Sequence, residues 1–132
     1  MRLTLDTSAY SQLMSGEQRV SDLVRRADEV FLSAIVFGEL MAGFRKGSRL
    51  DRNVEELRAF FDAPNSAFAT VGQTTADRYA RIKDALRARG RPLPANDVWI
   101  AAHAMETGAD LVSADRHFEN VDGIALILLQ PR

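Results

Sequence analysis

The sequence contains no cysteine and only two histidines, His103 and His117, among its 132 residues. The absence of cysteine excludes both a disulfide framework and a thiolate zinc site. Two histidines are too few for a histidine-rich metal centre. A metal bound by this chain would therefore be held mainly by oxygen ligands.

Long apolar runs are also absent, since no stretch approaches the roughly 20 residues that a membrane-spanning helix needs. Near the N-terminus, Asp6 interrupts the apolar region that a signal peptide would require. We therefore expect a cytoplasmic protein that has no membrane partner.

Neither sign of charge dominates, because the formal net charge is −1. The overall charge thus gives no indication of nucleic-acid binding. Basic residues nevertheless cluster in two stretches, 45–52 and 87–91. Such clusters are usually solvated helix ends, and they bear on function only if they flank a site that attracts a polyanion.

The composition, with 46% hydrophobic and 27% charged residues, is that of an ordinary globular protein. We expect one domain over residues 1–132. Short apolar segments alternate with amphipathic ones, which predicts an α/β fold of three layers, α/β/α, around a mainly parallel sheet of roughly five strands. The predicted strands lie within 3–5, 30–32, 67–71, 111–113 and 124–129; the predicted helices span 7–14, 18–27, 34–46, 50–61, 74–89 and 96–107.

Acidic residues occur where this fold collects function, at the carboxyl ends of its strands. Asp6 follows the first predicted strand, and Asp115 follows the fourth. Asp97 falls in the first turn of a predicted helix, and Glu39 interrupts the apolar stripe of another. If the first and fourth strands are neighbours, these four acids line one crevice. Helix capping is the alternative role for Asp97 and for Asp6, although Thr7 and Ser8 also offer caps to the first helix.

Clustered carboxylates need an explanation, because two charges about 4 Å apart repel by about 4 kcal/mol at an effective dielectric near 20. Four together must either hold protons or bind cations. Carboxylates suit hard ions such as Mg²⁺ or Mn²⁺. A site of this kind activates water and stabilises the two oxygens of an in-line displacement at phosphorus.

Two serines stand beside the first and fourth acids. Ser8 and Ser113 are candidates to bond a metal-bound water or a phosphate oxygen, although their spacing favours helix capping. His117 is interpreted as a surface residue without a chemical role. Glu119 lies one helical turn beyond Asp115, and its place at the crevice edge stays open.

Four motifs occur in order along the chain: Leu5-Asp6-Thr7-Ser8, Gly38-Glu39-Leu40-x-x-Gly43, Asn96-Asp97-x-Trp99-Ile100-Ala101-Ala102 and Leu111-Val112-Ser113-Ala114-Asp115-Arg116-His117-Phe118. Together they resemble the PIN-domain ribonucleases and, more narrowly, the VapC-type toxins of bacterial and archaeal toxin–antitoxin pairs. The resemblance implies a PIN-like fold over the whole chain and an endoribonuclease that depends on Mg²⁺ or Mn²⁺. It identifies Asp6, Glu39, Asp97 and Asp115 as the catalytic acids, with the three aspartates as metal ligands.

The resemblance also implies RNA as substrate, a homodimer, and a small cognate antitoxin of the VapB kind that inserts into the site. Some family members carry a further acid shortly after the fourth one, where this chain has Arg116 and His117. Arg116 is expected to moderate the repulsion among the acids and to hold the scissile phosphate. A surface for a second copy or an antitoxin helix is expected at Leu40, Met41 and Phe44, or at Phe60 and Phe61, with burial in the core as the alternative for at least half of them.

Other functions remain as alternatives. The nearest is a PIN-domain nuclease of RNA processing outside a toxin–antitoxin pair, or a PIN-like fold kept only for binding. A receiver-like signalling domain that binds Mg²⁺ needs a phosphoacceptor aspartate after a middle strand and a late lysine, but the third strand ends without an acid and no lysine follows Lys83. A haloacid-dehalogenase-like phosphatase needs a second aspartate where Ser8 stands.

Overall fold

Five parallel strands form a single sheet in the order β3-β2-β1-β4-β5 in the computed structural model, which describes residues 1–131. The strands are β1 (Arg2–Leu5), β2 (Glu29–Ser33), β3 (Ser66–Ala69), β4 (Asp110–Ser113) and β5 (Leu126–Leu128). Every pair is parallel, so all carboxyl ends lie at one edge of the sheet. β1 and β4 are neighbours, with Leu5 opposite Val112, as the crevice hypothesis requires.

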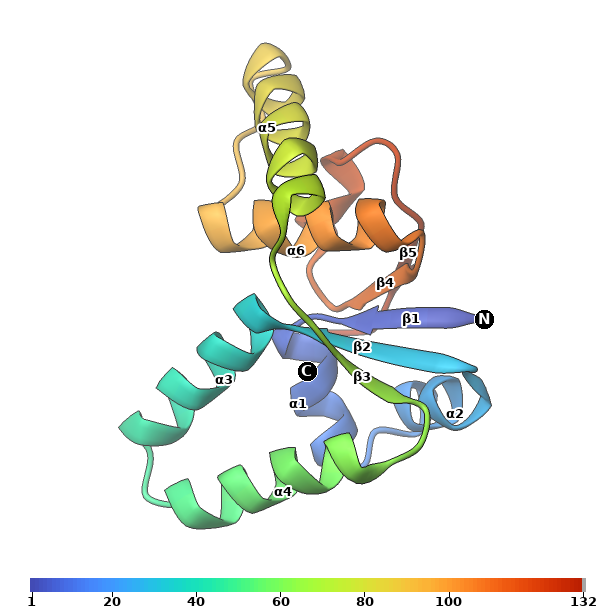
Figure 1. The fold of residues 1–132 in the computed structure, drawn as a ribbon, viewed down its shortest axis with the longest axis vertical. Helices are drawn as coiled ribbons and strands as arrows, with labels where there is room; N and C mark the ends of the chain where they lie inside the picture. Colours follow the sequence, from blue (N-terminus) through green and yellow to red (C-terminus); the bar gives the residue numbers. More distant parts are fainter. Residues whose placement is uncertain (132) are drawn as a thin grey trace.

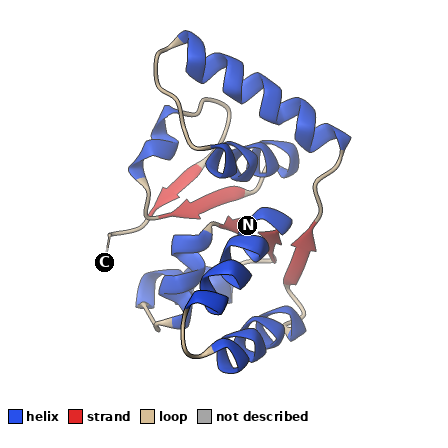
Figure 2. Cartoon of the chain, turned by 90° about the vertical axis from the view of Figure 1, so that its left-hand side faces the viewer, coloured by secondary structure: helices blue, strands red, loops and turns tan. Residues whose placement is uncertain are grey.

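Six helices cover the sheet and complete the predicted three-layer fold. In Figure 1, α5 and α6 lie above the strands and α1 to α4 lie below them; Figure 2 shows the same two groups from the side. The helices are α1 (Thr7–Met14), α2 (Gln18–Arg26), α3 (Ala34–Lys46), α4 (Leu50–Asp62), α5 (Gln73–Ala88) and α6 (Ala95–Thr107), followed by the short 3₁₀ helix η1 (Arg116–Asn120). Among residues 1–131, no helix is long and apolar enough to cross a membrane.

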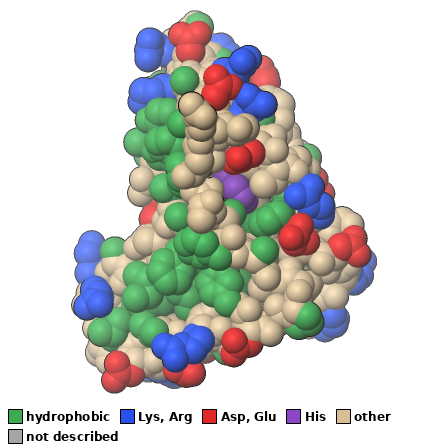
Figure 3. All heavy atoms as spheres, in the orientation of Figure 1, with side chains coloured by type: hydrophobic (Ala, Val, Ile, Leu, Met, Phe, Trp, Pro, Cys, Tyr) green, Lys and Arg blue, Asp and Glu red, His purple; other side chains and the backbone are tan. Residues whose placement is uncertain are grey.

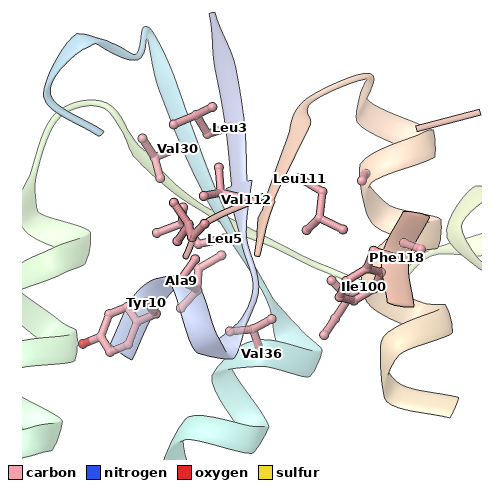
Figure 4. Close-up of a cluster of buried hydrophobic side chains, with 14 of the residues drawn as sticks. Leu3, Leu5, Ala9, Tyr10, Val30, Val36, Ile100, Leu111, Val112 and Phe118 are labelled. Atoms are coloured by element: carbon pink, nitrogen blue, oxygen red, sulfur yellow. The ribbon is translucent and has the colours of Figure 1, made fainter. Parts of the chain in front are cut away.

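The core lies on both faces of β1 and β4, the central strands. Leu3, Leu5, Leu111 and Val112 are fully buried, and Figure 4 shows them between side chains of the flanking helices, among them Ile100. A parallel sheet covered on both faces needs apolar residues at nearly every strand position. This requirement explains why the strands are short, continuous apolar runs in the sequence.

Two helix boundaries predicted from single residues are confirmed, and one expectation about capping is wrong. The Ser33 side chain caps α3 by accepting from the Val36 N–H, and Gly47 ends that helix. Helix α1, however, is capped by Asp6, whose carboxylate accepts from the Ala9 N–H at 2.8 Å. Thr7 and Ser8 lie inside the helix, where their side chains bond other groups.

The remaining differences occur at the edges of the sheet and on α5. Strands β3 and β5 are shorter than predicted, because each pairs on one side only. The segment after Asp115 forms η1, which the sequence pattern does not reveal. On α5, Ala76 was expected on the inner face by its helical spacing, but it is exposed. Thr75 is buried in its place, and its hydroxyl donates to Glu106 at 2.6 Å.

Apolar residues on α3 and α4 divide between core and surface. Leu40 and Phe60 are buried in the core. Met41 and Phe61 instead line a groove of about 300 Å³ between the two helices, together with Phe37, Val54 and Leu57. Figure 3 shows a broad area of hydrophobic side chains over this lower part of the molecule. Of the residues predicted for a contact surface, Met41 and Phe61 thus line the groove, whereas Leu40 and Phe60 belong to the core.

Candidate active site at the carboxyl edge of the sheet

Asp6 lies immediately after the central strand β1 and is only 6% exposed. Its carboxylate accepts hydrogen bonds from the Ser113 hydroxyl at 2.5 Å and from the Ser8 hydroxyl at 2.7 Å, in addition to the Ala9 N–H. Burial raises the pKa of Asp6, and these three hydrogen bonds oppose the rise because they favour the charged form. The structure thus holds this carboxylate in one orientation.

Ser8 and Ser113 position Asp6; they cap no helix, and the capping interpretation is wrong. Each hydroxyl donates to Asp6 and also accepts a backbone N–H: Ser8 from Ala114 at 3.0 Å, and Ser113 from Asp115 at 2.9 Å. The two serines therefore connect the first acid to the backbone that carries the fourth.

Asp97 lies in the first turn of α6 and is half-buried. The N-cap of this helix is Pro94, so capping does not account for the aspartate. Burial raises the pKa of Asp97 to about 6, and the charges of Asp115, Glu39 and Asp6 add to the effect. Each of the other three acids predicted for the site thus acts electrostatically on Asp97.

Glu39 connects the beginnings of two helices. Its carboxylate accepts from the Thr7 hydroxyl at 2.6 Å and from the Asn96 amide at 3.2 Å. These bonds explain how a glutamate is accommodated on the flank of the apolar face of α3, since a buried carboxylate is costly unless it has partners. Sequence reasoning missed both partners, although Thr7 and Asn96 each adjoin a predicted acid.

Asp115 follows β4 and caps η1, with its carboxylate accepting from the backbone N–H of His117 at 2.9 Å. Nδ1 of His117 lies 2.8 Å from the same oxygen. His117 also opposes the rise in the pKa of Asp97. His117 is exposed, as predicted, but its contact with Asp115 gives it a place beside the site that the prediction excluded. A polar residue two places after an aspartate is the spacing of an Asx turn, which could have indicated the contact.

Arg116 directly follows Asp115 and begins η1. Its guanidinium is mostly exposed and pairs with Glu119 at 3.4 Å. The neighbour that counteracts the acids around Asp97 is His117. Glu119 is accordingly the partner of Arg116 on the same turn of η1.

The four acids form an electrostatic group but not a preassembled ion cage. Within residues 1–131, no three acidic or histidine side chains lie close enough together to hold a metal ion. The hydrogen bonds described above hold the carboxylates of Asp6, Glu39 and Asp115 on separate partners. The donors are nevertheless all carboxylate oxygens, which is the ligand type that Mg²⁺ and Mn²⁺ prefer.

Comparisons with known proteins give a single family. The profile of the PIN domain matches residues 3–124. Ribonuclease VapC5 of Mycobacterium tuberculosis is 28% identical over 123 residues, which cover 93% of this chain and 90% of the relative.

Solved structures share the fold over nearly the whole chain. VapBC2 from Rickettsia felis, bound to a DNA fragment from its promoter, superposes with a TM-score of 0.88 at 20% identity and covers 98% of this chain and 100% of its own. VapBC-5 from Mycobacterium tuberculosis, a member of the VapBC family of toxin–antitoxin systems, gives a TM-score of 0.73 at 25% identity, with 97% and 98% covered.

Proposed function

The chain belongs to the PIN-domain family, and from this membership and the geometry of its acids we propose that it is a metal-dependent endoribonuclease. In this proposal it hydrolyses phosphodiester bonds of RNA and acts as the VapC-type toxin of a toxin–antitoxin pair. The relatives named ribonuclease VapC support the reaction and the biological role.

The single observation that carries the proposal is the arrangement of four acids that come from separate parts of the chain: Asp6 after β1, Glu39 on α3, Asp97 in the first turn of α6 and Asp115 after β4. A carboxyl at the start of a helix should ionise easily, because the helix dipole favours negative charge there. Burial instead raises the pKa of Asp97 to about 6, and the charges on Asp115, Glu39 and Asp6 add to the rise. Such repulsion is costly in a protein that binds nothing, but it favours a cation that enters among these groups.

The metal ligands in this proposal are Asp6, Asp97 and Asp115. A bound Mg²⁺ or Mn²⁺ would supply water activation and would offset the charge that develops on the phosphate. Ser8 and Ser113 hold the Asp6 carboxylate in a fixed orientation, as the partners of metal ligands commonly do. His117 does the same for Asp115.

Glu39 has a different role, as the fourth catalytic acid. Thr7 and Asn96 fix its carboxylate from two sides without neutralising it. It therefore keeps the capacity to accept a proton from the attacking water as the new phosphorus–oxygen bond forms and the ribose oxygen leaves. Arg116, exposed on η1, contributes a positive charge to the phosphate of the bound RNA.

A small antitoxin is the proposed partner, and a homodimer is the proposed assembly. Structures of VapBC complexes share this fold. The groove between α3 and α4 supports the proposal, because its apolar lining is of the kind that receives an amphipathic helix.

The test of the reaction is cleavage of total cellular RNA by the purified chain, with Mg²⁺ or Mn²⁺ and with a chelator. We expect discrete cleavage sites only with the metal, and loss of at least 100-fold in rate for Asp6→Asn, since a metal ligand is removed. Asp84→Asn on the exposed side of α5 is the matched control. Equal cleavage by wild type and Asp6→Asn would refute the assignment.

A further inference from the structure

A second cavity lies beside the start of α6, and none of the four acids lines it. It has a volume of about 250 Å³ and lies between α5, α6 and the segment that joins them. Leu86, Leu93 and Val98 give it an apolar lining, while Lys83 and Arg87 contribute positive charges. Hydrophobic side chains gather over this upper part of the molecule in Figure 3, with Lys and Arg side chains beside them.

The cavity adjoins the acids at the first turn of α6. Gly90, Pro92 and Leu93 line the cavity and lead into α6, where Asp97 and Val98 are consecutive. Consecutive residues of a helix point about 100° apart. Asp97 thus belongs to the group of acids and Val98 to the cavity, on adjoining sides of one helical turn.

The charges at the cavity have few partners of their own. Within residues 1–131, Arg87 and Lys83 form no ion pair, and both are exposed one turn apart on α5. The Lys83 ammonium lies 5.6 Å from the centre of the Tyr79 ring, which stacks on Trp99 at 4.1 Å. Cations beside an apolar cavity and an aromatic pair are the groups that bind single-stranded nucleic acid, because they match its phosphates and its bases.

We propose that this cavity receives a nucleotide of the substrate RNA next to the cleaved bond, with its base on Pro92 and Leu93 and its phosphate at Lys83 and Arg87. The inference rests on the proposed ribonuclease function and identifies where that enzyme selects its sequence. A second copy of the chain is the poorer occupant, because a twofold contact would bring the same cationic rim together from both copies.

The test compares two double variants that remove equal charge. Lys83→Gln with Arg87→Gln alters the cavity, and Arg25→Gln with Arg26→Gln alters exposed residues at the end of α2. Binding of a labelled single-stranded RNA is measured in chelator, where metal-dependent cleavage cannot interfere. The logarithm of the association constant falls linearly with the logarithm of the salt concentration, and each phosphate contact on a single strand contributes about 0.7 to the steepness of this line. Loss of two contacts therefore lowers the steepness by about 1.4, which weakens binding about 25-fold at 0.1 M salt.

We expect that loss for the cavity variant and a smaller change for the α2 variant. Leu93→Trp, which fills the cavity, should shift the nucleotides that flank the cleavage sites. Equal binding by the two double variants would overturn the proposal. A change in the molar mass of the cavity variant without a change in its RNA binding would also overturn it, because it would identify the cavity as a contact between copies of the chain. Wild type that binds this RNA through the cavity but never cleaves RNA would refute the proposed function and leave the binding site standing.

Discussion

The ionisation of Asp97 should affect stability between pH 4 and pH 7, because burial and the neighbouring acids raise the pKa of this carboxyl. The pKa is about 6 in the folded chain, against 3.8 for an unperturbed aspartate. Well below pH 3.8 the carboxyl is protonated in both the folded and the unfolded state, so it has no net effect. As pH rises from 4 to 6 the folded state binds the proton more tightly, and stability falls.

Replacement of Asp97 by Asn should remove this loss. We expect the free energy of unfolding at pH 7 to rise by about 1–2 kcal/mol. This gain is smaller than the free energy that corresponds to a shift of about two pK units, because water screens the charge of a half-exposed group. At pH 3 the gain should vanish, because the carboxyl is protonated in both states there. Urea unfolding at both pH values measures it, with Asp84→Asn as the control; a gain of equal size at pH 3 would show that packing, and not charge, is responsible.

Replacement of Ser113 should lower stability, in contrast to replacement of Asp97, because the Ser113 hydroxyl donates to Asp6 from a fully buried position. Ser113→Ala should cost about 1.5–3 kcal/mol, the usual value for a hydrogen bond to a charged group. It should also raise the pKa of Asp6 further, since this bond lowers it. Ser11→Ala on the exposed side of α1 serves as control, and unchanged stability of Ser113→Ala would remove the serine from the positioning of Asp6.

At the scale of the element, α6 carries the site at its first turn and the core along its length. Val98, Ala101 and Ala102 are buried, which fixes the helix against the sheet and thereby fixes Asp97. The helix ends at Gly108, whose φ of +71° lies in the left-handed region. This glycine is thus required by the backbone.

Two glycine substitutions should separate backbone strain from helix propensity. Gly108→Ala should lower stability by about 1–2 kcal/mol, because the left-handed conformation is unfavourable for alanine although there is space for its methyl group. Gly43→Ala, inside α3 and also with open space, should raise stability by about 0.5–1 kcal/mol. Thermal unfolding measures both, and a loss at Gly43 would indicate a close contact that this account lacks.

The elements were largely predictable from the sequence, and the connections within the site were not. Apolar periodicity indicates the strands and helices because burial imposes it. The bonds from Thr7 and Asn96 to Glu39, and the bond from Ser113 to Asp6, depend on how separate segments meet, and local sequence does not contain that information. The capping role of Asp6 and the contact of His117 with Asp115 are local, and the polar residues that follow each aspartate could have indicated them.

At the scale of the molecule, the parallel sheet brings acids from distant parts of the chain to one edge. Apolar side chains remain on the outside, among them Phe68 on the edge strand β3, which is 46% exposed. We expect the isolated chain to form a homodimer that covers part of this surface. Light scattering should give twice the chain mass of 14.6 kDa, and a monomer at every concentration would contradict the expectation.

The central claim, that the acids at the carboxyl edge of the sheet bind a divalent metal, is tested most directly by titration with Mn²⁺ followed by electron paramagnetic resonance. The account predicts saturable binding by wild type and by Asp84→Asn, and loss of at least tenfold in affinity for Asp6→Asn, Asp97→Asn and Asp115→Asn. Absence of binding by wild type, or wild-type affinity in all three variants, would contradict it.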